Sequence, residues 1–497
     1  MNMSNSRFSR RSWIKSAGAF GLVLASGISR SDRARADDKL NVIDIGSRRQ
    51  LFVGQDLIDR IDGVRQVLHH PVRRQIAIEP EHPWEKHGVS YMVAFKDGDR
   101  FRAWYRVDAA EFGKAKRRTM TAYAESEDGV HWHKPRLGII VFNGSKENNL
   151  VWDGGPGNLA PFRDDNPKCN PEERYKTVAR SADLHALVSP DGLHWKLTKG
   201  SPIFTDRPFD SHNIAFWDEE TQQYVTYTRG IRKDGELGQA MAGEFLSGVR
   251  WVRRATSRDF VNWSELEPIQ TGDSPREELY TNATIRYARA PDYLLMFPSR
   301  FASAREPKPG WKFGKGVNDI AFLSSRDGIH FDRTFMKGFI RPGLDQGNWH
   351  ERSLYMERGI LQTSPTELSL YCMQNWRLPT VHIRRYTLRL DGFVSVQADY
   401  QGGTLVTKPI RFSGNELCLN FSTSAVGWIK IELQDANGKP LAGFTYADCP
   451  EIYGDKLDAK VTWKSDADVA SLAGKTIRLR IEMSDADLYS FQFSATK

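Results

Sequence analysis

The sequence predicts an all-β protein, a five-bladed β-propeller followed by a C-terminal β-sandwich. One observation is a short motif that recurs four times, and the other is a final hundred residues of alternating apolar and polar positions. The motif copies begin at Ser126, Ser189, Ser257 and Ser325, and their aspartates lie 63, 68 and 68 residues apart. Self-similarity at a nearly fixed period indicates an array of one structural unit.

Each motif copy has the chemistry of a tight turn. The first reads Ser126-Glu127-Asp128-Gly129-Val130-His131-Trp132, and the others keep the serine, the aspartate and the final aromatic. Ser and Asp side chains bond nearby backbone amides, and glycine tolerates a positive φ. We interpret each copy as a hairpin turn of one blade. Its aspartate (Asp128, Asp191, Asp259 or Asp327) is then structural.

The propeller is expected to contain five blades, each opening with a strand near the axis. Candidate inner strands are residues 89–95, 159–162, 213–217, 281–287 and 353–359. The fifth blade has no motif copy. Residues 41–45 and 50–53 are strand-like and are expected to supply its missing outer strand. Closing the ring with both ends of the chain would remove free sheet edges.

The composition changes after about residue 395. Short alternating strands are expected at residues 416–421, 428–433, 476–481 and 489–493, separated by turn residues. Many short strands in a hundred residues favour a β-sandwich. The predicted domains are therefore a propeller over 37–395 and a sandwich over 396–497.

Residues 1–36 are typical of a twin-arginine signal peptide. Arg10-Arg11 precede an apolar run over 17–28, and Ala34-Arg35-Ala36 offers a cleavage site. The run is too short to span a bilayer as a mature anchor. We expect export to the periplasm or the cell exterior, and no membrane span afterwards. A disordered basic tail is the alternative.

Net charge and cysteine content exclude some classes of function. The chain carries +8, but residues 1–36 hold seven basic residues and one acidic residue, so the remainder carries +2. That value argues against a nucleic-acid role based on general basicity. The four cysteines form no C-x-x-C pair, which disfavours a zinc site. Cys418 and Cys449 either form a disulfide or stay as buried thiols.

Acidic residues precede the inner strands, where a propeller's funnel opens. Asp210 and Glu278 each lie 49 residues before a motif aspartate, and Glu85 and Glu351 precede the first and fifth inner strands. Glycoside hydrolysis uses one carboxyl as acid and another as nucleophile or base. We expect Asp210 to be the base or nucleophile and Glu278 the acid, with Glu85 and Glu351 orienting substrate or exchanging those roles. Any single one of these acids could instead be structural.

Aromatic and basic residues at the same places suggest a carbohydrate ligand. Trp84, Tyr280 and Trp349 could stack on sugar faces, and Arg352 could bind a carboxylate or sulfate. His212 is either a funnel ligand or a packed histidine. Arg341 lies in a predicted rigid loop and could face the substrate. No cofactor is required, and a structural calcium ion is possible.

Two segments resemble known glycosidases. Residues 257–265 are similar to the S-x-D-x-x-x-W turn of the five-bladed propeller glycosidases of families 32 and 43, and residues 216–224 resemble their inner hairpin. From about residue 40 the chain resembles exported bacterial family-32-like glycosyl hydrolases, through residues 125–130, 279–282 and 366–371.

This resemblance implies hydrolysis of O-glycosyl bonds. Asn158, His212 and Asn282 stand where those families carry catalytic acids, so the family residues are not transferred. We include Asn282 among the substrate-binding candidates.

Three functions follow from these patterns. The first is an exported glycoside hydrolase that degrades a poly- or oligosaccharide in the funnel through paired carboxylates. The second is a non-catalytic carbohydrate-binding propeller, favoured by the missing family acids. The third is a lyase on uronic-acid polymers, which requires His212 and Tyr280 to converge with Arg352.

Overall fold

The computed structural model describes residues 41–109, 119–206, 209–232, 248–464 and 467–495. These residues contain strands, loops and three 3₁₀ helices: η1 (Pro171–Glu173), η2 (Gln346–Asn348) and η3 (Val469–Leu472). No α-helix occurs in them, which confirms the all-β prediction. None of their helices is long and apolar enough to cross a membrane. The predicted signal peptide lies outside the described residues.

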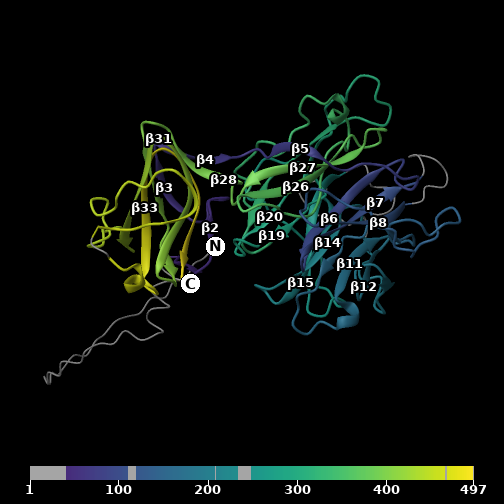
Figure 1. Cartoon of the computed structure of the whole chain (residues 1–497), viewed down its shortest axis with the longest axis horizontal. Coiled ribbons are helices and arrows are strands. Elements are labelled where there is room, and N and C mark those ends of the chain that lie inside the picture. The colour runs from purple at the N-terminus through teal and green to yellow at the C-terminus, as the bar shows by residue number, and fades with distance from the viewer. Residues whose placement is uncertain (1–40, 110–118, 207–208, 233–247, 465–466, 496–497) are drawn as a thin grey trace, which may run out of the picture. The chain divides into compact units, whose positions relative to one another are not determined.

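Three four-stranded antiparallel sheets follow one another along the chain (Figure 1). The first contains β6 (Val89–Asp97), β7 (Arg100–Asp108), β8 (Thr119–Ser126) and β9 (Leu150–Trp152). The second contains β10 (Phe162–Arg163), β11 (Tyr175–Arg180), β12 (Leu184–Ser189) and β13 (Lys196–Leu197). The third contains β14 (Ile214–Asp218), β15 (Gln223–Arg232), β16 (Val249–Ser257) and β17 (Glu267–Pro268).

The next part of the chain departs from this regularity. One sheet contains β18 (Leu279–Tyr280), β21 (Ser299–Ala302) and β22 (Val317–Ile320), and another contains β19 (Ile285–Arg286), β20 (Leu294–Met296) and β23 (Leu323–Ser325). The inner strand expected over 281–287 is therefore wrong, because β18 and β19 belong to different sheets. A five-stranded sheet follows, with β24 (Tyr355–Met356), β25 (Leu361–Gln362), β26 (Glu367–Gln374), β27 (His382–Arg389) and β5 (Val72–Ile78).

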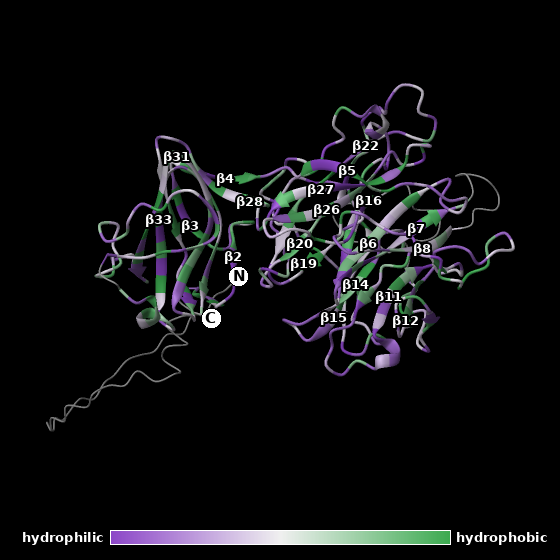
Figure 2. Ribbon diagram, viewed as in Figure 1, coloured by the Kyte–Doolittle hydropathy of each residue, from purple (hydrophilic) through white to green (hydrophobic). Residues whose placement is uncertain are grey.

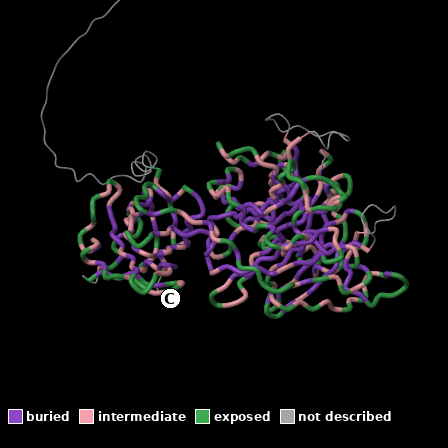
Figure 3. The backbone as a smooth tube through the Cα atoms, turned by 90° about the horizontal axis from the view of Figure 1, so that it is seen from above, coloured by how far each residue is buried: buried purple, intermediate pink, exposed green. Residues whose placement is uncertain are grey.

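Large aromatic residues fill the contacts between these sheets. Trp104 on β7 stacks on Phe95 and meets Tyr175 of the second sheet at 6.4 Å between ring centroids. The five-stranded sheet contacts the first sheet, because Val93 and Arg358 form a parallel bridge. In Figure 3 buried residues gather in the interior and exposed residues lie along the outer loops. Aromatic burial is the main source of stabilisation in such contacts.

The four serine–aspartate motifs are turns, as predicted. In the second copy the Ser189 hydroxyl accepts a bond from the Gly192 amide at 2.9 Å, and Asp191 Oδ1 accepts from the amides of Leu193 and His194. The glycine has a positive φ in three copies, and Phe260 has a φ of 67° in the remaining one. The motif therefore satisfies its own backbone groups locally.

Residues 43–68 and 394–494 form a ten-stranded sheet around one apolar core. Its strands are β1 (Ile43–Gly46), β2 (Gln50–Leu51), β3 (Ile58–Asp62), β4 (Val64–Leu68), β28 (Val394–Ala398), β29 (Gly403–Thr407), β30 (Ile410–Phe412), β31 (Glu416–Asp435), β32 (Asp455–Lys460) and β33 (Thr476–Ser494). Polar and apolar residues alternate along β33 (Figure 2).

The prediction of four separate strands in this region is wrong. They form only two long strands, β31 and β33, which pair along most of their length with a register shift between Thr423 and Trp428. A shift of this kind bends a strand without ending it, so turn-like residues inside β31 do not break the pairing.

The strand expected to complete the fifth blade is also corrected. Residues 43–46 and 50–51 pair with β30 and β33 of the ten-stranded sheet, and β5 instead pairs with β27. The early strands carry large apolar residues such as Phe52, which packs on Phe491 in the C-terminal core. The chain thus enters the ten-stranded sheet before the small sheets begin and returns to it after β27.

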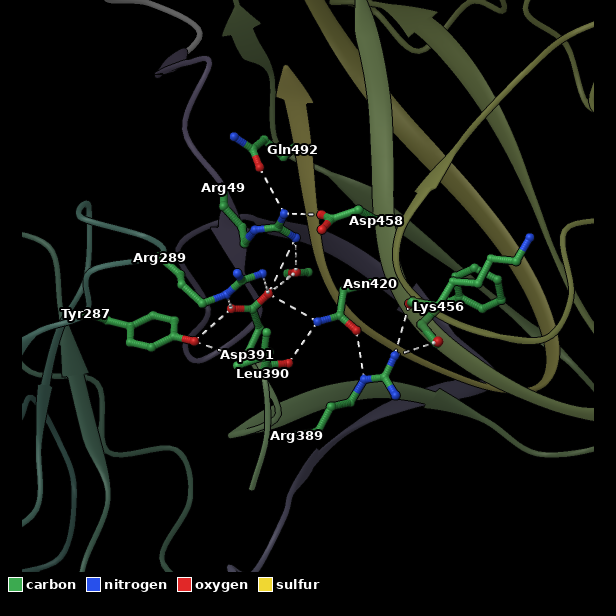
Figure 4. Close-up of polar contacts among 12 residues, drawn as sticks. Arg49, Tyr287, Arg289, Arg389, Leu390, Asp391, Asn420, Lys456, Asp458 and Gln492 are labelled. Carbon is green, nitrogen blue, oxygen red and sulfur yellow. Dashed lines mark hydrogen bonds and ion pairs between the residues drawn. The ribbon is translucent and has the colours of Figure 1, made fainter. Parts of the chain in front are cut away.

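A buried carboxylate sits where the chain passes from β27 to β28 (Figure 4). Asp391 is fully buried and accepts hydrogen bonds from Tyr287 and Arg289, each at 2.8 Å, and from Asn420 at 3.1 Å. Arg49 Nη1 lies 3.4 Å from the same carboxylate. The Asp391 carboxylate therefore joins residues that are far apart in the sequence.

Candidate functional site

The inner ends of the small sheets share an unusual backbone. Tyr91 lies within β6, Asn158 and Arg352 lie shortly before β10 and β24, and Thr281 directly follows β18. Each has a φ between 53° and 60°. Non-glycine residues rarely adopt this conformation, and strain of this kind clusters at functional sites. At Tyr91 it coincides with a register shift between β6 and β7, which re-aims the side chain.

Asp210 lies at the centre of these strand ends. Its Oδ2 accepts hydrogen bonds from Arg229 Nη1 and from the Tyr280 hydroxyl, both at 2.8 Å. Arg180 Nη2 lies 3.9 Å from Oδ1. The side chain of Asp210 is 31% exposed, so it reaches solvent while contacting residues of three sheets.

The surroundings keep Asp210 ionised. Burial raises the pKa of its carboxyl, but the charges of Arg229 and Arg180 and the Tyr280 hydrogen bond together outweigh that effect. The pKa of Asp210 therefore lies below its usual range. Burial and the nearby Asp210 charge raise the pKa of Tyr280, so its phenol stays protonated and can donate.

Two more predicted acids are each held by arginine and are linked to Asp210 through Tyr280 or Arg352. Glu278 accepts from Arg250 at 2.6 Å, and Arg250 in turn lies over the Tyr280 ring at 5.7 Å. Glu351 pairs with Arg352 at 3.0 Å and also with Arg377.

We call this group the central cluster. Its members are Tyr91, Arg106, Asp108, Arg180, Asp210, Arg229, Arg250, Glu278, Tyr280, Glu351, Arg352, Tyr355 and Arg377.

The remaining predicted acid, Glu85, belongs to a separate network. It is fully buried and accepts from the Tyr105 hydroxyl at 2.7 Å and from Lys134 at 2.9 Å. The amides of Glu81 and His82 donate to the same carboxylate. These contacts hold the loop before β6. Trp84 lies in that loop, buried, with its indole N–H on Asn149 and its ring stacked on His82.

His212 and Asn282 are both buried and take no part in the ion pairs of the central cluster. His212 is 1% exposed, neither ring nitrogen has a hydrogen-bond partner within the described residues, and its ring centroid lies 5.4 Å from that of Tyr91. Burial, reinforced by the Arg358 charge, lowers the pKa of His212 to about 3, so the imidazole is neutral. Asn282 donates to the His212 carbonyl at 3.0 Å and positions that strand end.

The last two predicted ligands lie on exposed loops. Trp349 is 42% exposed, and its indole N–H donates to the Gly343 carbonyl at 2.8 Å. Its chain position places it three residues before Arg352. Arg341 is exposed and lines a pocket together with Arg73, Gln374 and Tyr386, none of which belongs to the central cluster.

The arginines are the part of the site that sequence reasoning missed. Arg106 and Arg180 each lie near the end of a second strand and pair with the start of an inner segment, opposite Ser90 and Gly157. An antiparallel second strand ends where the inner strand begins. An arginine near the end of a second strand was therefore a usable signal in the first two sheets.

The described residues show no metal site. Within them, no group of three or more His, Cys, Asp or Glu side chains is placed to hold an ion. A structural calcium ion stays a prediction. Cys418 and Cys449 are both free thiols in the described structure, and burial raises the pKa of each.

Comparisons with known proteins give likeness only at low identity. No protein-family model and no curated protein matches the chain. Among solved structures, an exo-inulinase from Aspergillus awamori is 12% identical with a TM-score of 0.39, covering 87% of this chain and 100% of that one. A fructofuranosidase from Schwanniomyces occidentalis is 12% identical with a TM-score of 0.39, covering 86% and 98%.

A third structure is named for the GH130 family of mannoside phosphorylases, described as containing glycoside hydrolases that target β-1,2 mannosidic linkages in Candida mannan. It is 16% identical with a TM-score of 0.41, covering 64% of this chain and 94% of that one. Likeness at this level assigns no family and no site residue.

Proposed function

We propose that the chain is an exported glycoside hydrolase that acts on a poly- or oligosaccharide at the central cluster. The observation that carries the proposal is Asp210, a partly exposed carboxylate held in its ionised form where several sheets meet. Two residues with a left-handed backbone, Tyr91 and Arg352, lie close enough for their charges to act with that of Asp210. An ionised carboxylate in such a place can act on an anomeric carbon directly or through a water molecule.

The roles follow from the position of each acid. Asp210 either bonds to the anomeric carbon, giving a glycosyl ester that water then hydrolyses, or takes a proton from a water molecule whose oxygen bonds to that carbon. In both cases the bond from the anomeric carbon to the leaving oxygen breaks. Glu278 delivers the proton to the leaving oxygen, for which it must leave Arg250 when substrate binds. Glu351 holds Arg352 and Arg377 and orients the substrate through them.

The proposed architecture is a five-bladed propeller with a C-terminal sandwich. The three four-stranded sheets, the paired three-stranded sheets and the five-stranded sheet support five blades in order. The domain limits of 37–395 and 396–497 and export by the twin-arginine route to the periplasm or cell exterior are part of the proposal. It requires no cofactor.

A screen tests the activity. The purified protein is incubated with plant and algal polysaccharides, and both reducing ends and the ultraviolet absorbance of unsaturated sugars are measured. We expect reducing ends without unsaturated products, and loss of activity in Asp210→Asn and Glu278→Gln. Glu147→Gln, an exposed acid paired with Arg136, is the matched control. Full turnover in both variants would show that Asp210 and Glu278 do not have the proposed catalytic roles.

A non-catalytic carbohydrate-binding protein is the second candidate. It is favoured because arginine pairs with Asp210, Glu278 and Glu351 alike. Binding of a polysaccharide without any new reducing end would support it. Unsaturated products would instead support a lyase. Tyr280 and Arg352 do lie in one cluster with Asp210, but His212 is buried beneath them.

A further inference from the structure

The central cluster carries more positive than negative charge. Within the described residues it contains six guanidinium groups, from Arg106, Arg180, Arg229, Arg250, Arg352 and Arg377. They face four carboxylates, from Asp108, Asp210, Glu278 and Glu351. A site that needed only to place two acids around a neutral sugar would not require this excess.

Two of the six guanidinium groups are the most accessible. The side chains of Arg180 and Arg352 are each 36% exposed, whereas that of Arg229 is 4% exposed and has its charge met by Asp210 at 2.8 Å. Arg180 comes from the second sheet and Arg352 from the segment before β24. Both lower the pKa of Asp210, so their charges act on the same carboxylate from different sheets.

Both exposed arginines keep donor groups for a ligand. Arg180 approaches Asp210 no closer than 3.9 Å, which is longer than a hydrogen bond. Arg352 uses Nε to hold Glu351 at 3.0 Å. The left-handed backbone of Arg352, with a φ of 60°, fixes the direction in which its side chain leaves the strand. Guanidinium groups bind carboxylates and sulfate-like oxyanions through paired N–H donors.

One exposed aromatic ring contacts an arginine of the central cluster, and another lies close to Arg352 in the sequence. Arg377, which pairs with Glu351, lies over the ring of Phe313 at 5.3 Å, and Phe313 is 50% exposed. Trp349 is 42% exposed and precedes Arg352 by three residues. Ring faces beside guanidinium groups suit a ligand that has both an apolar sugar face and an anionic substituent.

We infer that the site takes an acidic saccharide and that Arg180 and Arg352 bind its carboxylate or sulfate group. This inference rests on the proposed function, because it places the saccharide at the same cluster. The anion lies between two sheets, and the sugar ring that carries it is positioned beside Asp210.

Calorimetric titration with matched polymers tests the inference. One pair is polygalacturonate and its fully methyl-esterified form, and the other is a sulfated galactan and its desulfated form. We expect the protein to bind the charged member of one pair at least about tenfold more tightly, since a charge-assisted hydrogen bond contributes more than a neutral one. The pair that shows the difference tells whether the group is a carboxylate or a sulfate.

Variants assign the effect to the two arginines. Arg180→Gln and Arg352→Gln should each weaken binding of that charged polymer by about ten- to a hundredfold and leave the neutral form unaffected. Arg136→Gln, an exposed arginine in a surface pair, should bind as the unaltered protein does. Arg352→Lys keeps the charge and distinguishes a lost contact from a misfolded variant, and thermal unfolding is measured for all four.

Equal affinity for charged and neutral members of both pairs overturns the inference, as does failure to bind either charged polymer. Unchanged binding in both glutamine variants overturns it too. Its failure is separable from that of the proposed function. If the protein hydrolyses a neutral polymer and shows no preference for charge, the proposed hydrolase activity stands and the inference of an acidic ligand fails. If it binds a charged polymer tightly without cleaving it, the inference stands and the hydrolase activity fails.

Discussion

Aspartates serve two different purposes in two regions of this molecule. In the serine–aspartate turns, Asp191 and its three counterparts accept bonds from amides two and three residues ahead, so their contacts are complete within seven residues. In the central cluster, Asp210 is balanced by Arg229 of the same sheet, Arg180 of the preceding one and Tyr280 of the following one. The first kind of aspartate shapes its own backbone, and the second depends on the assembled sheets.

The two kinds of carboxylate also differ in where their hydrogen-bond partners come from. A turn aspartate accepts through Oδ1 from amides of its own loop and through Oδ2 from the following histidine or asparagine. Asp210 accepts at Oδ1 from the amide of the next residue, Ser211, but its Oδ2 accepts from Arg229 and Tyr280, and two partly exposed arginines act on it. The turn aspartate is therefore satisfied by its own loop, whereas Asp210 lies among charges from several parts of the chain.

The largest expected effect is on turnover. Asp210→Asn should lower kcat on a substrate found in the screen by about 10²–10⁴-fold, as removal of an acid–base or nucleophilic group does. Asp327→Asn in a turn should leave kcat within about twofold, since that side chain does not act on substrate. Steady-state kinetics of both variants measure this contrast. Equal losses in the two would erase the distinction drawn between the regions.

A second prediction concerns the buried carboxylate at the junction. Asp391→Asn should lower the free energy of unfolding by about 3–5 kcal/mol, because it leaves the charge of Arg289 without its carboxylate and removes one of the two carboxylates that face Arg49. Urea titration followed by tryptophan fluorescence measures it. Asp455→Asn breaks an exposed pair with Arg389 and should cost less than about 1 kcal/mol. A loss below that value at Asp391 would show that its partners relax to other contacts.

A smaller loss is expected when one turn is altered. Asp191→Ala removes the acceptor for two amides and should lower the free energy of unfolding by about 0.5–2 kcal/mol, similar to loss of a helix cap. Activity should persist. Glu127→Ala, an exposed neighbour within the first turn, serves as the control. Loss of activity without loss of stability in Asp191→Ala would give the turn a role in the site.

The smallest effect is in the dependence of stability on pH. Burial raises the pKa of Asp191 and Asp259, but the turn amides and the side chains of His194 and Asn262 outweigh it and lower each pKa to about 2. Because the folded pKa is below the unfolded one, the stabilisation is complete above about pH 4 and is lost as the pH falls toward 2.

Asp191→Asn/Asp259→Asn should therefore show a shallower fall in the free energy of unfolding between about pH 4 and pH 2 than the unaltered protein. Acid titrations of both proteins, followed by circular dichroism, compare the two slopes. Identical slopes would contradict the lowered pKa values.

The repeated turns and the all-β class could be predicted from the sequence because their causes are local. A serine, an aspartate and a glycine within four residues determine their own hydrogen bonds, and alternation determines which face of a strand is buried. The same reasoning placed Asp210 and Glu278 at inner strand ends. It found them because they recur at a fixed distance before the turns.

Pairings between distant segments needed the tertiary structure. Residues 43–46 and 50–51 are strand-like in any context, and only packing against Phe491 and its neighbours decides that they join the C-terminal sheet. Glu85 and Asp210 each lie a few residues before an inner strand. Lys134 and Tyr105 enclose the first in a buried network, and arginines from two sheets keep the second at the surface. The sequence alone determined the repeating unit and the residue types at the strand ends, because those depend on contacts within a few residues. Which carboxylate remained accessible was decided by tertiary structure alone, because the charge that balances each one comes from a different part of the chain.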